Sequence, residues 1–88
     1  MLYVTACLNI ISTENVDYIM KEFKDLENET LKEKGCIYFH VHLLDQEKIM
    51  LWEIWEDENA LNNHHQMPHT VSCANKKLTE VNWLLKNQ

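Results

Sequence analysis

The residues best suited to chemistry lie between positions 53 and 69 of this sequence. Glu53 is flanked by apolar residues in a run of strand formers, and Trp55 follows two positions later. A carboxylate among apolar side chains has a raised pKa and can accept a phenolic proton. A tryptophan offers an aromatic ring a flat surface and an N–H donor. Both are therefore candidates for chemistry on an aromatic molecule; the alternatives are a structural carboxylate and a core tryptophan.

Two histidines follow, His64 and His69. His69 could act as an acid or a base near neutral pH. The alternative is that both histidines only hydrogen-bond within a helical corner or edge a cleft. A metal site is not expected, because Pro68 interrupts the helix before His69 and no nearby cysteine or paired carboxylate completes a ligand shell.

Composition limits the partners that the chain can bind. It has 88 residues, a net charge of −6 and no arginine, so nucleic acid is not an expected partner. Three widely spaced cysteines fit neither a disulfide framework nor a zinc pattern, and free thiols favour a cytoplasmic location. The apolar N-terminus lacks a basic leader and is too short to span a membrane, so we predict no membrane association.

The elements that must position these residues alternate along the chain. Runs of strand formers predict strands at 2–11, 36–44, 49–56 and 81–85. Apolar residues at helical spacing follow a hydroxyl cap at 12–15 and predict a helix that ends at 32–35, with cations in its last turn and Gly35 as its left-handed cap. Further helices are expected from Asp57 to His64 and over 69–78. The order β-α-β-β-α-β predicts one α+β domain over residues 1–88, with a ferredoxin-like antiparallel sheet and helices on one face.

The apolar residues on both faces of the strand at 49–56 predict that a second protein chain packs against the sheet. One of its faces carries Met50, Trp52 and Ile54, and the other carries Leu51 and Trp55 around the carboxylate. Both faces of an antiparallel strand are apolar only where both are covered, and two helices cover one. We therefore predict a homodimer that pairs through the sheet face.

The chain resembles the antibiotic biosynthesis monooxygenase family. The resemblance rests on the order Gly35-Cys36-Ile37-Tyr38, then Glu53-Ile54-Trp55, Asp57, Ala60-Leu61 and His64, then Pro68-His69. It implies a dimeric α+β barrel and a monooxygenase that uses no cofactor and acts on a quinol or phenolic small molecule. Alternative readings are a non-catalytic dimer that binds a small apolar ligand and a haem-degrading enzyme.

The resemblance also implies roles for single residues. Trp55, Glu53 and His69 would be catalytic, and His64, Asn9 and Phe39 would contact the substrate. No metal ligand is implied. The sequence departs from the family in its short turn at 45–48, in Thr70 where an aromatic residue often stands, and in its short stretch from 69 to the last strand. Cys36 is expected to be an unreactive packing residue, because it follows the negative end of a helix.

Overall fold

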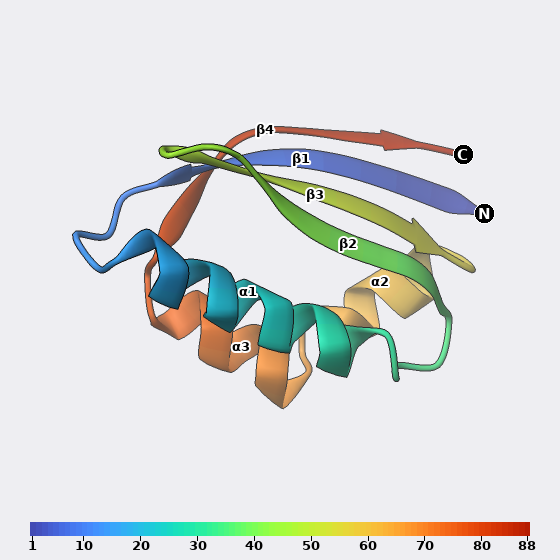
Figure 1. Cartoon of the computed structure of the whole chain (residues 1–88). Helices are drawn as coiled ribbons and strands as arrows, with labels where there is room; N and C mark the ends of the chain where they lie inside the picture. Colours follow the sequence, from blue (N-terminus) through green and yellow to red (C-terminus); the bar gives the residue numbers. More distant parts are fainter.

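The computed structural model describes all 88 residues, which form four strands and three helices. In chain order the elements are β1 (Leu2–Ile10), α1 (Val16–Thr30), β2 (Cys36–Asp45), β3 (Lys48–Trp55), α2 (Glu58–His64), α3 (Pro68–Asn75) and β4 (Thr79–Asn87). The strands form one antiparallel sheet in the order β2-β3-β1-β4, and the helices all lie on one of its faces (Figure 1). The predicted ferredoxin-like α+β fold is confirmed. No helix combines the length and the apolar character that crossing a membrane demands.

The core lies between the sheet and the helices. Successive side chains of a strand point to opposite faces, so alternate residues of each strand enter the core. The strand residues in it are Leu2, Val4, Ala6, Leu8, Phe39, Val41, Ile49 and Trp55, which pack against Ile19, Phe23 and Leu26 of α1. The other face of the sheet has no element of this chain over it (Figure 1).

Trp52 and Trp55 show what this one-sided cover does to β3. Trp55 faces the helices and is 0% exposed, whereas Trp52 faces away from them and is 41% exposed. The two apolar faces were expected from the sequence, and the chain by itself covers only one of them.

The ends of α1 differ from the prediction. Its cap is Asn15, whose Oδ1 accepts a hydrogen bond from the Asp17 backbone N–H at 2.8 Å, and not a hydroxyl residue. The helix ends at Thr30, before the lysines, so no cation lies in its last turn. Gly35 does adopt a positive φ, +89°, but it lies in the turn that enters β2 and not at the helix end.

The C-terminal elements also have other bounds than predicted. Proline at the first helical position starts α3, because its missing N–H would have no partner there. That helix ends at Asn75, and Lys77 reverses the chain with φ +52°. β4 is longer than the five residues predicted, because it pairs with β1 from Tyr3 to Ile10 and hydrogen bonds extend it past its apolar centre.

Candidate functional site

A cavity of about 330 Å³ lies between the sheet and the helices. Its apolar lining includes Ala6, Leu8, Phe23, Leu26, Phe39, Leu51, Cys73, Leu78, Val81 and Leu84. Its polar lining comprises Glu53, His64, His65, Thr70, Thr79 and Glu80. A mostly apolar cavity with a few polar groups is the usual form of a small-molecule site.

Glu53 is the buried carboxylate of this cavity. It lies on the helix-facing side of β3, two residues from Trp55, so the two side chains share a face. The Trp55 Nε1–H donates a hydrogen bond to Glu53 Oε1 at 2.8 Å. Burial raises the pKa of Glu53; the Trp55 hydrogen bond opposes this shift, and the negative charge of Glu33 adds to it. The pair is thus a buried base held in one orientation by an indole.

Trp55 itself is fully buried and is not among the residues that line the cavity. Its ring contacts His64, with centroids 4.8 Å apart, and meets Phe39 edge-on at 6.5 Å. In this chain the indole therefore lies behind the cavity wall and orients Glu53. Its predicted role as a surface for substrate stays a prediction.

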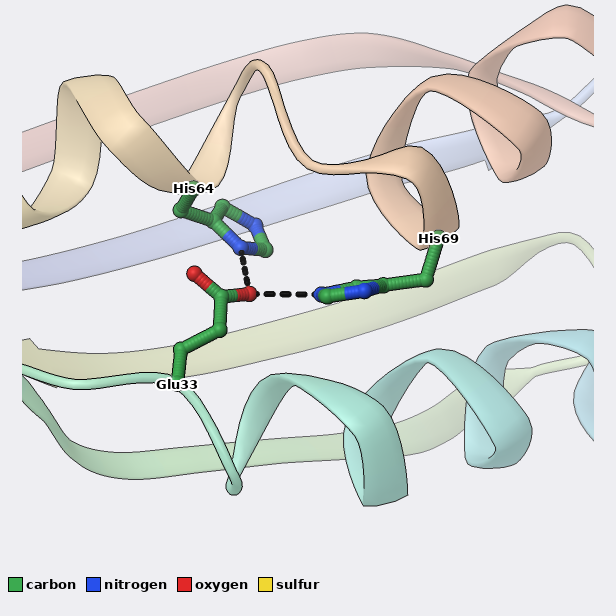
Figure 2. A group of neighbouring side chains, drawn as sticks. All are labelled: Glu33, His64 and His69. Carbon is green, nitrogen blue, oxygen red and sulfur yellow. Dashed lines mark hydrogen bonds and ion pairs between the residues drawn. The ribbon is translucent and has the colours of Figure 1, made fainter.

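A second polar cluster joins Glu33, His64 and His69 (Figure 2). Glu33 Oε2 lies 2.7 Å from His64 Nδ1 and 2.6 Å from His69 Nε2. The Thr70 hydroxyl lies 3.3 Å from the same His64 nitrogen. Three separate places supply the cluster: the turn after α1, the last residue of α2 and the second residue of α3. We name Glu33, His64 and His69 the His-Glu-His cluster.

Gly35 lets the turn that carries Glu33 approach α2. A Cβ on Gly35 would lie 2.6 Å from the Ala60 Cβ, a distance that real side chains do not reach. The Gly35 carbonyl also accepts a hydrogen bond from the Glu56 backbone N–H at 2.9 Å. The short contact and the positive φ both require glycine. The same turn brings Glu33 to His64, 31 residues later in the chain.

Burial sets the titration of the groups around this cluster. It lowers the pKa of His64, and Glu33 opposes that shift through its hydrogen bond and its charge. It raises the pKa of the Cys36 thiol to about 11, helped by the charges of Glu33 and Glu53. A high thiol pKa agrees with the expectation of an unreactive Cys36. The main cause, however, is burial and not the end of a helix.

Apart from Trp55, the five other predicted site residues lie in three places. Glu53, His64 and Phe39 line the cavity, where the Phe39 and His64 rings lie 5.5 Å apart. His69 lines a neighbouring hollow of about 150 Å³ on the other side of Cys73 and Leu26. Asn9 faces away from the helices and accepts a hydrogen bond from Asn82, so it does not line the cavity.

Glu33 was missed because it lies in the charged run 32–34, which is typical of a solvated helix end. Its side chain is only 4% exposed. The sequence argument against a metal rested on the helix break at Pro68 and on the lack of a nearby cysteine or paired carboxylate, and Glu33 supplies a carboxylate beside both histidines. The only signal was that the single glycine follows it and forces the turn back toward α2.

Comparison with known proteins identifies the family. The profile described as "Antibiotic biosynthesis monooxygenase" matches residues 1–76. The chain belongs to the antibiotic biosynthesis monooxygenase family. An antibiotic biosynthesis monooxygenase of known crystal structure superposes with a TM-score of 0.84 at 19% identity, over 100% of this chain and 97% of that one. At that identity the superposition shows the shared fold alone.

Other known proteins are more similar in sequence. The uncharacterized protein YjcS of Bacillus subtilis is 54% identical over 89 residues, which cover 99% of this chain and 85% of YjcS. A solved structure of protein YJCS has a TM-score of 0.97 at 53% identity, over 99% of this chain and 96% of that one. A conserved protein of Methanosarcina mazei Go1 has a TM-score of 0.79 at 27% identity, over 100% of this chain and 92% of that one.

Proposed function

We propose that this protein is a cofactor-independent monooxygenase of a small phenolic or quinol substrate, with Glu53 as the base. The observation that carries the proposal is the Glu53 carboxylate, which is buried in an apolar cavity and held by the Trp55 N–H. A base in an apolar site has a raised pKa, so it accepts a phenolic proton more readily than an exposed carboxylate. The family assignment supports an oxygenase.

The proposed reaction uses O2 as its only oxidant. Glu53 takes the hydroxyl proton of the substrate, and the phenolate gives one electron to O2, forming superoxide and a phenoxyl radical. The radicals join through a C–O bond at the para carbon. Loss of the hydrogen at that carbon and cleavage of the O–O bond leave a carbonyl and hydroxide, which takes the proton from Glu53. One phenol and one O2 thus give one quinone and one water.

The size of the cavity sets the size of the substrate. An apolar cavity of ~150 Å³ holds benzene, so about 330 Å³ suits a molecule of two fused rings. The four pyrrole rings of haem exceed this space. The cavity volume therefore supports a phenolic substrate over haem.

One observation favours a second candidate, a protein that binds a small apolar ligand without turnover. Trp55 is covered on all sides and offers no ring surface to the cavity. If a stacked substrate is required for reaction with O2, the cavity would bind phenols and release them unchanged. Binding without oxygen uptake would identify this function.

We further infer that two chains pair through the open face of the sheet. That face exposes Tyr3, Tyr38, Trp52, Trp83 and Leu85. Contiguous exposed apolar surface marks an interaction site, and the sheet-to-sheet dimer expected from the sequence would cover it. Sedimentation equilibrium at micromolar concentration should give twice the chain mass. Trp83→Ser should weaken the dimer, whereas Val71→Ser on α3 should not; a monomeric mass for the unchanged protein would contradict pairing.

The test of the oxygenase is oxygen uptake with 1-naphthol and with menadiol, measured above autoxidation. We expect naphthoquinone from naphthol and a loss of at least about 100-fold in kcat for Glu53→Gln, the lower end of the range for a general base. Glu47→Gln, in the exposed turn before β3, is the matched control and should keep full activity. Uptake that survives Glu53→Gln would exclude Glu53 as the base. Binding of naphthol without uptake would replace the oxygenase by the ligand-binding candidate.

A further inference from the structure

The His-Glu-His cluster lies at the edge of the cavity and takes no part in the proposed proton transfer. Its three donor atoms, Glu33 Oε2, His64 Nδ1 and His69 Nε2, all lie within 4.8 Å of one another. Figure 2 shows the two imidazoles converging on one carboxylate oxygen from separate helices. Convergence of three ligand-type atoms from three elements is what a metal site requires.

The buried carboxylate of Glu33 is the feature of the cluster that argues for a metal ion. The side chains of Glu33 and His64 are 4% and 5% exposed, and that of His69 is 19% exposed. A buried carboxylate needs a positive partner or a metal ion. The chain has no arginine, and none of its lysines forms an ion pair with Glu33. The only groups that reach the carboxylate are the two imidazoles.

We propose that Glu33, His64 and His69 bind one divalent transition-metal ion of the zinc type. Two imidazoles and one carboxylate form the ligand set of open zinc sites and of two-histidine, one-carboxylate iron sites. Three protein ligands leave a coordination position for water or for an oxygen atom of a bound molecule. This assignment goes beyond the proposed oxygenase reaction and does not depend on it.

The geometry fits an ion after a small movement. Bonds of about 2.0–2.1 Å around a tetrahedral ion set neighbouring donor atoms roughly 3.3 Å apart. The present separations of 2.7 and 2.6 Å must open by somewhat more than half an ångström, and the two histidine nitrogens, which lie within 4.8 Å of each other, must reach the same spacing. His69 can give way, because it lies in the first turn of α3 and is the most exposed of the three. The Thr70 hydroxyl, 3.3 Å from His64 Nδ1, is a polar neighbour for a water at the open position.

The position of the cluster links the ion to the cavity. His64 belongs to both, since it is a cluster residue and also lines the cavity. An ion held there would lie beside the cavity wall that His64 forms, where a molecule in the cavity could reach its open position. The ligand class that this favours is a small molecule with an oxygen donor, such as a phenolate or a carboxylate.

The test is metal binding by the full chain after removal of metals with a chelator. Titration calorimetry with zinc chloride at pH 7.5 should give one site per chain with a micromolar or lower Kd. Glu33→Gln and His69→Asn should each weaken binding at least tenfold. The matched control is the double variant His40→Asn/His42→Asn on the open face, which should bind zinc as the unchanged protein does.

A measurement without variants guards against loss of folding. Cobalt(II) should give visible bands without the near-ultraviolet bands of thiolate ligands. In nitrogen NMR of the zinc-bound protein, His64 Nδ1 and His69 Nε2 should shift most. A Kd above about 100 µM, thiolate bands, shifts confined to His40 and His42, or binding unchanged in Glu33→Gln and His69→Asn would overturn the proposal.

Discussion

β3 presents apolar side chains to both faces of the sheet, and these two faces have different surroundings in the structure. The face toward the helices holds Trp55, Glu53 and the cavity; its side chains on β1 and β3 are mostly buried, whereas Val81 and Leu84 of β4 are 59% and 46% exposed. The open face holds Trp52, His42 and Trp83, and both of these tryptophans are 41% exposed. The Trp52 Nε1–H donates to His42 Nδ1 at 3.3 Å, with the two rings stacked. Burial on one face creates a site with altered acidity, whereas exposure on the other creates a surface for a partner.

Replacing one tryptophan on each face tests this difference most strongly. Trp55→Ala should lower the free energy of unfolding by about 3–5 kcal/mol, because it empties a fully buried position. Trp52→Ala should cost the single chain less than about 1.5 kcal/mol, because much of the ring is already in solvent. Urea unfolding at low protein concentration measures both. Equal costs would show that the open face is covered as fully as the inner one.

The next prediction concerns the turn that carries Glu33, which a substitution at Gly35 should disturb. Gly35→Ala should lower the free energy of unfolding by about 2–4 kcal/mol, the sum of a positive φ and a clash with Ala60. It should also move Glu33 away from the histidines. Thermal unfolding measures the cost, and adding Ala60→Gly should recover the part due to the clash. A cost below about 1 kcal/mol would mean that the turn relaxes freely.

Sequence reasoning reached the fold and part of the site. The strands, the helices and the common face of Glu53 and Trp55 follow from periodicity, which depends on neighbours in the chain. Periodicity did not predict that this face turns toward the helices. The pairing of Glu33 with His64 joins residues 31 positions apart through one glycine turn, and no local pattern reports it. Asn9 shows the opposite error. The family resemblance placed it in the predicted site, but the alternation of β1 turns it to the open face.

The raised pKa of Glu53 on the inner face can be tested through the pH dependence of the free energy of unfolding. The pKa of Glu53 is higher in the folded protein than in the unfolded chain, so the folded state binds more protons between the two values. The Glu53 contribution is therefore fully present below about pH 4 and is lost as the pH rises through the folded pKa. Glu53→Gln lacks this loss, so it should gain stability relative to the unchanged protein between pH 4 and pH 7.

Urea unfolding across that pH range measures this difference. The lowered pKa of His64 acts in the other direction, since its contribution is lost as the pH falls below about 6.5. It acts in both proteins and cancels in the comparison. A difference that does not change with pH would mean that Glu53 is hydrated and has an ordinary pKa.

The smallest expected effect uses Cys36 as a probe of charge on the inner face. Its pKa of about 11 lies two units above the ordinary 9.0, which lowers the thiolate at pH 8 about 100-fold. Higher basicity recovers part of this in nucleophilicity, so alkylation by iodoacetamide should be about tenfold slower than for an ordinary thiol. The negative charges of Glu33 and Glu53 both raise this pKa, and Glu33 has the larger effect. Glu33→Gln should therefore speed the reaction a few-fold.

Cys73 serves as the control within the same chain. Burial raises its pKa too, but the charges near it are those of Lys76 and Glu22, so Glu33→Gln should leave its rate unchanged. Mass spectrometry of digested protein separates the two cysteines, and a chelator in the buffer keeps metal out of the cluster. If Cys36 alkylates equally fast with and without the Glu33 charge, burial and Glu53 set its pKa without Glu33. Glu33 would then be too well screened by its histidines to influence the cavity.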